Sequence, residues 1–373
     1  MKSLGIYIHI PFCKTKCPYC DFYTVPYDPI VASAYVNKII DFFKTTNCLA
    51  PYEIDTIYFG GGTPSLLEVD LLCDILTTIN EVAQVSLNCE VTIETNPTNI
   101  QLHTLQKLRI GGFNRISFGV QSSNADHLKK LGRKHTTNDV VEAIALAREA
   151  LFSNISIDLM LAIPHQNIEQ LQDSIKFAIG LGIDHISAYL LKIEENTPYY
   201  RNNMQNHCAD DDMQADMYLL LIDELKKAGY DQYEISSFCK DKKYSKHNLK
   251  YWNCESYLGI GTSAHSFFEG KRFYFPRDLQ AFLHTDILFD LTIVDAIYEN
   301  VPIDEYIMLK LRLNRGLDLS EVEVRYGLSS DILLKKATTL EKQQLVSIEK
   351  GCICLTGKGF LLSNRIINFF LDN

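Results

Sequence analysis

The feature that most constrains the fold is a regular alternation of strand-like and helix-like segments through the first half of the chain. Short apolar, β-branched runs are separated by longer stretches with the apolar spacing of amphipathic helices. This alternation predicts a parallel sheet of about six strands with helices outside it. The predicted strands are Ile6–Ile10, Thr56–Phe59, Val91–Glu94, Arg115–Val120, Ser156–Leu161 and His185–Leu191. The predicted helices are Ile30–Lys44, Leu66–Asn80, Leu102–Leu108, Asp139–Leu151 and Ile168–Leu181.

Six strand–helix units are too few to close an eight-stranded barrel. We therefore expect an α/β fold, an open and partial (β/α)6 TIM-like barrel. In such folds the chemistry lies at the C-terminal ends of the strands, and the polar and glycine residues of this chain gather at those ends.

The second half of the chain has a different sequence pattern. A predicted helix at Asp211–Ala228 leads into a less regular region rich in Tyr, Trp and His. Beyond about residue 299, helices are followed by a β-hairpin, which is typical of a winged-helix-like domain. This segment is close to charge balance and has no basic face, which favours packing or partner docking over DNA binding. The elements predicted there are helices at Ile303–Leu313, Ser320–Tyr326, Ser330–Glu341 and Phe360–Leu371, and strands at Leu345–Ile348 and Cys352–Leu355.

These changes divide the chain into three parts. We predict a barrel over residues 1–230, a barrel extension over 231–298 and a helical, winged-helix-like C-terminal domain over 299–373.

Three cysteines directly after the first predicted strand suggest a metal site. Cys13, Cys17 and Cys20 have the spacing C-x3-C-x2-C, which suits three corners of a [4Fe–4S] cluster. Three thiolates leave one iron of such a cluster open for a small molecule. The alternatives are disulfides or a structural zinc site, but zinc normally needs a fourth Cys or His at matching spacing, and none follows closely.

Composition excludes several classes of function. The chain has 373 residues, of which 46% are hydrophobic, so it can bury a large core. Its formal net charge of -10 argues against a general binder of nucleic acid or anionic membranes. Eleven cysteines without a framework pattern fit a reducing compartment. The chain shows neither a signal-peptide pattern nor an apolar stretch of membrane-spanning length, so we expect a cytoplasmic protein.

Further candidate residues stand at the ends of the predicted strands. The glycines of Gly60–Pro64 allow close approach of a ligand to the backbone, although a plain strand-to-helix turn would look the same. Glu94 ends the third strand, where a carboxylate can accept both hydroxyls of a ribose. Gln121 offers an amide after the fourth strand, and Arg133 can clamp a carboxylate. Asp158 is a charge within an apolar strand, and a buried pair with Arg133 is its structural alternative.

Together these motifs resemble the radical S-adenosylmethionine (SAM) superfamily. The resemblance rests on C-x3-C-P-Y-C-D-F, the GGGTP loop and Ser117–Ser122, and it points to the branch around oxygen-independent coproporphyrinogen III dehydrogenase. Three further segments are similar to the radical SAM heme chaperones of that branch. They are Tyr233–Ser236, His247–Trp252 and Gly259–Ser266.

The resemblance implies cofactors and site residues. Cys13, Cys17 and Cys20 would hold the cluster, SAM would bind the open iron through its amine and carboxylate, and an electron from the cluster would cleave SAM. The SAM pocket would be lined by Tyr7, Gly61, Gly62, Thr63, Glu94, Gln121, Arg133 and Asp158.

The resemblance also implies a heme site. His247, in the motif H-N-x-x-Y-W, would be the axial ligand of heme iron, beside the aromatic side chains of Tyr251 and Trp252. Its alternative is a surface histidine in the polar run Lys243–Lys250. His265, after a glycine turn, is either a second heme contact or, as we expect, a buried structural histidine.

The function that follows is that of a heme chaperone, which binds heme, passes it to an acceptor protein and needs an electron donor for its cluster. The alternatives are oxidative decarboxylation of coproporphyrinogen and radical SAM degradation of heme. Two departures disfavour the dehydrogenase. Phe22 stands where that enzyme has a further cysteine, and the chain starts only a few residues before its first strand, without the enzyme's N-terminal extension.

Overall fold

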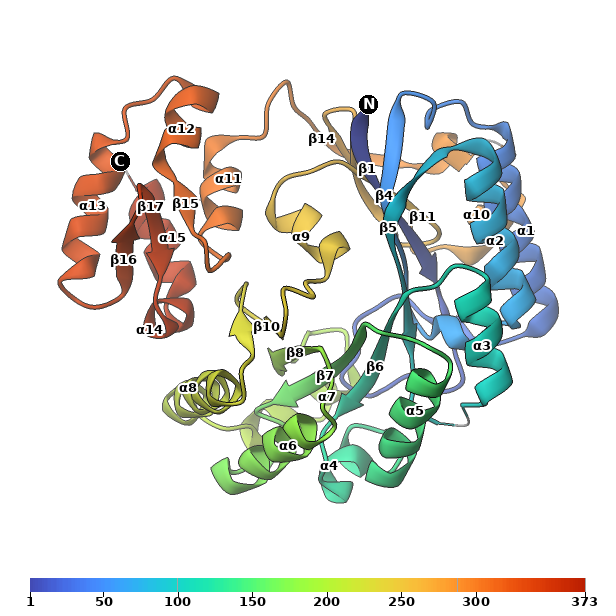
Figure 1. The fold of residues 1–373 in the computed structure, drawn as a ribbon, viewed down its shortest axis with the longest axis horizontal. Coiled ribbons are helices and arrows are strands. Elements are labelled where there is room, and N and C mark those ends of the chain that lie inside the picture. The colour runs from blue at the N-terminus through green and yellow to red at the C-terminus, as the bar shows by residue number, and fades with distance from the viewer. Residues whose placement is uncertain (99, 287, 373) are drawn as a thin grey trace.

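A computed structural model describes residues 1–98, 100–286 and 288–372 of the chain. The predicted strand–helix alternation is present, with the strands side by side and the helices outside them (Figure 1). The six strands are β1 (Lys2–Ile10), β4 (Tyr52–Gly61), β5 (Gln84–Thr95), β6 (Arg115–Gln121), β7 (Ile155–Leu161) and β8 (His185–Leu190), which are neighbours in that order and all parallel. The helices between them are α1 (Pro29–Thr45), α2 (Val69–Val82), α3 (Leu102–Ile110), α4 (Ala125–Lys130), α5 (Thr137–Glu149) and α6 (Ile168–Gly180).

Local sequence signals explain where these helices begin. Asp28 precedes α1, and its carboxylate accepts hydrogen bonds from the first free N–H groups of that helix. Thr136 before α5 and Asn167 before α6 each form a reciprocal capping box with the residue three positions later. Between the helices, β1 is buried along nearly its whole length, as expected for a parallel strand covered on both faces.

The sheet extends beyond the six strands on both sides. The strand β11 (Tyr257–Ile260) lies parallel to β1, with Ile6 beside Leu258, although the two are about 250 residues apart in the chain. Strands β12 (His265–Phe268), β13 (Lys271–Tyr274) and β14 (Ile293–Ile297) continue this edge in antiparallel order. At the other edge, β10 (Ser237–Cys239) is antiparallel to β8 and carries β9 (Asp231–Gln232). The region that looked irregular in sequence therefore completes a 12-stranded sheet.

The remaining elements connect these strands. They are β2 (Phe12–Cys13), β3 (Val25–Pro26), α7 (Pro198–Arg201), α8 (Asp211–Lys227), α9 (Lys246–Trp252) and α10 (Leu279–His284), with short 3-10 helices at Pro64–Leu66, Met204–His207 and Leu288–Leu291. Of these, α9 lies in the opening of the barrel (Figure 1), where the backbone N–H of His247 donates to Glu90 of β5.

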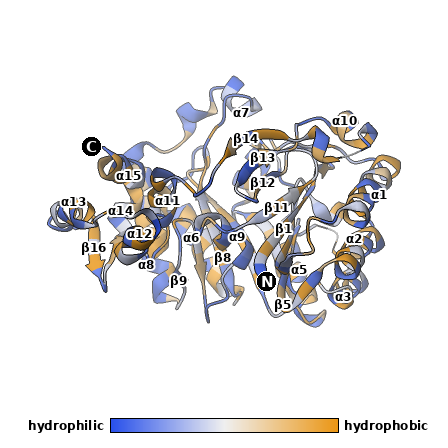
Figure 2. Ribbon diagram, turned by 90° about the horizontal axis from the view of Figure 1, so that it is seen from above, coloured by the Kyte–Doolittle hydropathy of each residue, from blue (hydrophilic) through white to orange (hydrophobic). Residues whose placement is uncertain are grey.

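The C-terminal part forms most of a second hydrophobic core, to which Tyr218, Cys254 and Phe267 also contribute. It consists of α11 (Ile303–Lys310), β15 (Leu317–Asp318), α12 (Leu319–Tyr326), α13 (Asp331–Glu341), β16 (Val346–Glu349), β17 (Cys352–Leu355), α14 (Gly357–Leu361) and α15 (Ser363–Leu371). The predicted hairpin is present as β16 and β17, and β15 adds a third strand. The single predicted helix at Phe360–Leu371 is wrong, because the chain forms two helices that meet at Leu362. Figure 2 shows this part and helices α1 to α3 at opposite ends of the molecule.

Two clusters of buried side chains correspond to this arrangement. One joins the helix-facing residues of the barrel strands, such as Ile57 and Ile157, to the buried faces of the surrounding helices, and it includes Phe268 and Phe275 of the extension. The other gathers the apolar residues of the C-terminal helices and hairpin, such as Val322 and Ile353. Within the described residues, no helix has the length and apolar character that a membrane crossing requires.

Candidate functional site

The three cysteines of the predicted cluster motif line one cavity. The loop that carries them leaves β1, passes through β2 and returns along β3, and the Cys20 N–H donates to the Cys17 carbonyl across 3.1 Å. All three thiols are free and partly buried, and they line a cavity of about 400 Å³ at the C-terminal ends of the strands. Burial raises the pKa of the Cys13 and Cys20 thiols.

The donor set of this loop fits an iron–sulfur cluster. Among the described residues, no three His, Cys, Asp or Glu side chains are close enough to bind a single metal ion. A cubane cluster spaces its thiolate ligands more widely than a single ion does, so three free thiols around one cavity suit the larger group.

The glycine loop after β4 forms a wall of the same cavity. Gly61 has φ +112°, and a Cβ atom there would lie 2.6 Å from Cε1 of His9, so only glycine fits. A Cβ on Gly62 would lie 2.7 Å from the Phe12 carbonyl oxygen. The N–H groups of Gly62 and Thr63 donate to the carbonyls of Ile10 and Phe12. The loop therefore holds the cysteine loop with its N–H groups and leaves carbonyl oxygens as the partners for a ligand.

Glu94 lies in this cavity with both carboxylate oxygens engaged. Its Oε1 accepts from the Tyr58 hydroxyl at 2.8 Å, and its Oε2 accepts from the Gly61 N–H at 3.1 Å. Each carboxylate oxygen can accept a second hydrogen bond, so the group can still receive ribose hydroxyls. Burial raises the pKa of Glu94.

Arg133 reaches the cavity from the loop after α4, and Gln121 reaches it from the end of β6. The guanidinium of Arg133 donates to Asn96 Oδ1 at 2.6 Å and to the Tyr19 hydroxyl at 3.0 Å, while its buried Nε has no partner. The structural alternative for Asp158, a buried pair with Arg133, is not among the ion pairs of the described residues, and polar neutral groups hold the arginine instead. Gln121 ends β6 at φ 67° and lines the same cavity.

Asp158 projects into the cavity from β7. Burial, reinforced by the negative charge of Glu94, raises the pKa of Asp158 to about 7. Arg115, on the neighbouring strand β6, also lines the cavity and is 2% exposed. Arg115 was not predicted as a site residue, although a charged residue at the start of an otherwise apolar strand could have indicated it. Asn248 of the H-N-x-x-Y-W motif is a second lining residue that was missed.

The structure places Tyr7 beside this cavity and not on its wall. The Tyr7 hydroxyl is 3.0 Å from His9 Nδ1, and its ring lies 6.2 Å from that of Tyr58 and 6.3 Å from that of His247. Tyr7 lines a second cavity of about 580 Å³. The two cavities share Tyr19, Cys20, Phe22 and Lys192, so they meet at the cysteine loop.

His247 is completely buried, which excludes the interpretation as a surface histidine. Its Nδ1 is 2.8 Å from Thr56 Oγ1, and its Nε2 is 2.9 Å from the Tyr251 hydroxyl. Burial lowers the pKa of His247 to about 3. Because both ring nitrogens are engaged, His247 can bind iron only if Tyr251 moves away.

The prediction for His265 is also wrong, because this side chain is exposed and not buried. We expected a buried structural histidine, but the side chain is exposed on the wall of the second cavity. Its ring stacks on that of Tyr274, with centroids 5.0 Å apart.

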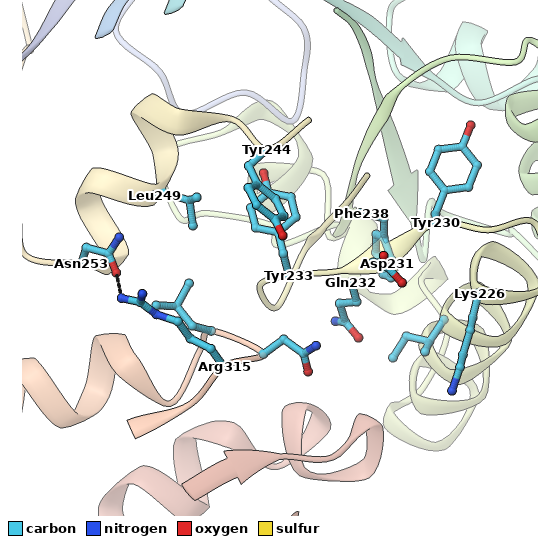
Figure 3. Close-up of a pocket in the computed structure, with 13 residues that line it drawn as sticks. Lys226, Tyr230, Asp231, Gln232, Tyr233, Phe238, Tyr244, Leu249, Asn253 and Arg315 are labelled. Carbon is cyan, nitrogen blue, oxygen red and sulfur yellow. Dashed lines mark hydrogen bonds between the residues drawn. The ribbon is translucent and has the colours of Figure 1, made fainter. Parts of the chain in front are cut away.

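A further cavity lies away from the cysteine loop. It has a volume of about 770 Å³ and lies between α8, α9 and the loop after α11. Figure 3 shows the rings of Tyr233 and Tyr244 against each other in it, and Arg315 directed at Asn253. None of the predicted site residues lines this cavity.

Family models match two segments of the chain. Residues 7–178 match the radical SAM superfamily, and residues 299–362 match the HemN C-terminal domain. Among solved structures, the coproporphyrinogen III oxidase HemN from Escherichia coli aligns with a TM-score of 0.85 at 23% identity, over 99% of this chain and 90% of that one. This similarity shows the fold, a radical SAM partial barrel with a helical C-terminal domain.

Relatives match from end to end. The heme chaperone HemW of Bacillus subtilis is 34% identical over 383 residues, which is 100% of this chain and 99% of the relative. The heme chaperone HemW of Lactococcus lactis is 33% identical over 376 residues, which is 99% of this chain and 98% of the relative. The chain therefore belongs to the HemW family within the radical SAM superfamily.

Proposed function

We propose that the protein is a heme chaperone, which binds heme and passes it to an acceptor protein while carrying a [4Fe–4S] cluster and SAM. The observation that carries this proposal is the full-length similarity to heme chaperones in a chain whose three free cysteine thiols line one polar cavity. An electron donor for the cluster is a further partner of this function.

Each group of the cluster cavity has a role in this proposal. Cys13, Cys17 and Cys20 would hold the cluster, which supplies single electrons for reductive cleavage of SAM. The carbonyl groups of the Gly61–Thr63 loop accept the hydrogen bonds of an amine. Arg133, which lines the cavity, receives a carboxylate in this proposal. Glu94 accepts ribose hydroxyls, and Gln121 and Asp158 complete the polar wall.

Tyr7 has a different place in the proposal from the one that sequence similarity implied. Its ring stacks on that of His247, with centroids 6.3 Å apart, and it lines the second cavity, which meets the cluster cavity at the cysteine loop. His247 would reach heme iron only after release of its hydrogen bond to Tyr251.

The alternative function is oxygen-independent coproporphyrinogen III dehydrogenase. Phe22 stands at the position of that enzyme's additional cysteine, and its side chain is 66% exposed beside the cysteine loop. An apolar ring cannot bind iron, so this position cannot supply a further ligand. The structural likeness to the Escherichia coli enzyme is a likeness of fold.

The proposal also covers the domain boundaries and the cellular location of the protein. We propose the division into residues 1–230, 231–298 and 299–373, and the second core, most of whose residues follow residue 299, supports its last boundary. We also propose a cytoplasmic protein that does not bind nucleic acid, which the free state of the eleven cysteines and the net charge of -10 support.

Anaerobic reconstitution of the cluster, followed by heme titration with and without SAM, tests the proposal. We expect stoichiometric heme binding in optical spectra and recovery of intact heme. Absence of heme binding, together with SAM cleavage and a vinyl product when coproporphyrinogen is added, would assign the protein to the dehydrogenases. Loss of the heme chromophore with SAM and a reductant would instead indicate heme degradation.

A further inference from the structure

We propose that a nucleoside diphosphate binds where the barrel meets the C-terminal part, with its phosphates on Lys310, Arg315 and Arg325. Two adjoining cavities form this site, namely the cavity of about 770 Å³ that Figure 3 shows and one of about 480 Å³. Asn253 and Arg315 line both, so one ligand can extend from the larger cavity into the smaller. Neither shares a lining residue with the cluster cavity, and the proposal does not depend on the heme chaperone function.

Three cations line the smaller cavity without a carboxylate partner. Lys310 ends α11, Arg315 precedes β15 and Arg325 lies in α12. None of the ion pairs between described residues includes any of the three. Like charges in one cavity repel each other, and an anion bound between them relieves this repulsion. The smaller cavity is therefore suited to an anionic group.

A neutral oxygen holds two of these cations together. The Nζ of Lys310 donates to Oδ1 of Asn253 at 3.2 Å, and the guanidinium of Arg315 donates to the same oxygen. Lys310 is only 5% exposed. Burial, reinforced by the positive charge of Arg315, lowers the pKa of Lys310. A buried ammonium beside a second cation is unfavourable until an anion compensates it, which a bound phosphate would do.

The acidic side chains of the smaller cavity are engaged with other groups. Glu255 is paired with Lys250 at 3.2 Å, and Glu321 accepts a hydrogen bond from the Tyr306 hydroxyl. The ring of Tyr306 also carries the guanidinium of Arg325, whose Cζ lies 5.0 Å from the ring centroid. The cations thus outnumber the acids, and neutral groups hold them in place.

The number of cations favours a diphosphate over a single carboxylate. The guanidinium groups of Arg315 and Arg325 can each bind two phosphate oxygens, and the ammonium of Lys310 can bind another. A carboxylate has only two oxygens and would leave part of this set unmatched. The larger cavity adds Lys226 and Asp231, one charge of each sign, on the side away from Arg315 (Figure 3). The excess of positive charge therefore lies at the end where the two cavities meet.

The larger cavity offers a place for the base of the nucleotide. The ring of Tyr233 is fixed, because its hydroxyl lies 2.7 Å from Nε2 of His185, and the ring of Tyr244 lies against it with centroids 4.8 Å apart. Both tyrosines line the cavity, and aromatic side chains are the usual stacking partners of a base. The amide groups of Gln232 and Asn314, which also line it, can pair with the polar edge of a base.

Isothermal titration calorimetry of the reconstituted full-length protein tests the inference, with ADP and inorganic pyrophosphate as probes. Saturating SAM keeps the adenine of ADP out of the cluster cavity. We expect ADP to bind in the presence of SAM, and Arg315→Ala to weaken the binding of both probes by more than about tenfold. Tyr244→Ala should weaken ADP alone, because pyrophosphate has no base. Arg365→Ala, at an exposed arginine of α15 outside both cavities, is the matched control and should bind like the wild type.

Four results would overturn the inference. The first is no binding of ADP in the presence of SAM, and the second is equal ADP affinity in Arg315→Ala and Arg365→Ala. The third is unchanged ADP affinity in Tyr244→Ala, which would leave an anion site without a place for a base. The fourth is tighter binding of a hexaglutamate peptide than of ADP, which would assign the cations to a surface for an acidic protein segment. Each of these results leaves the heme chaperone proposal untouched, since that proposal is tested by heme binding.

Discussion

Replacement of Gly61 by alanine should destabilise the protein strongly, because the glycine loop positions both the cysteine loop and Glu94. Gly61 has φ +112°, a conformation that costs a residue with a side chain about 1–3 kcal/mol. The new methyl group would also lie 2.6 Å from the His9 ring, and overpacking of this kind costs about 1–3 kcal/mol more. We therefore expect Gly61→Ala to lower the free energy of unfolding by roughly 2–6 kcal/mol.

Urea unfolding followed by circular dichroism measures this change. Gly180→Ala is the matched control, because Gly180 ends α6 and its added methyl group would meet no atom within 4 Å. In the helix this substitution should be neutral or stabilising by up to about 1 kcal/mol. If Gly61→Ala unfolds at the same urea concentration as the wild type, the loop is free to adjust and the steric reasoning is refuted.

Three further predictions concern the two cavities. The raised pKa of Asp158, about 7 against an ordinary 3.8, means that the folded state holds this proton more tightly than the unfolded state. The stability that it contributes is present below pH 4 and is lost as the pH rises to about 7. Asp158→Asn should therefore flatten the dependence of the free energy of unfolding on pH in that window. Equal slopes of this dependence in the wild type and the variant would contradict the prediction. His247→Ala leaves two buried hydroxyls without their partner and should cost about 1–3 kcal/mol in thermal unfolding, whereas a cost below that of His103→Ala would exclude the buried network. Cys20→Ser should lose reconstituted iron and sulfide while Cys73→Ser retains them, and equal iron content in the two variants would remove Cys20 from the cluster.

That the three cysteines share one cavity was predictable because the signal is local. Cys13, Cys17 and Cys20 lie within eight residues, so their spacing alone brings them to one loop. The residues at the strand ends were predictable for a related reason, since parallel strands direct their C-terminal ends to one edge, where Glu94 and Asp158 indeed meet. The alternation of strands and helices likewise identified all six barrel strands.

Burial and partners of single side chains were not predictable, because contacts between distant segments decide them. Thr56 and His247 are 191 residues apart, and only the packing of α9 into the barrel opening brings them together. Arg133 donates to the hydroxyl of Tyr19, which lies 114 residues earlier. The strand β11 has four residues and lies beside β1, a pairing that no short window of sequence contains.

The sequence by itself therefore determined the barrel, the cluster loop and the family, since these depend on short-range spacing and strand order. The tertiary structure decided which histidine is enclosed and which is accessible. The barrel encloses His247, although it stands in a polar run, and leaves His265 on a cavity wall. The physical reason is that burial is a property of the whole packed chain, whereas spacing is a property of a few consecutive residues.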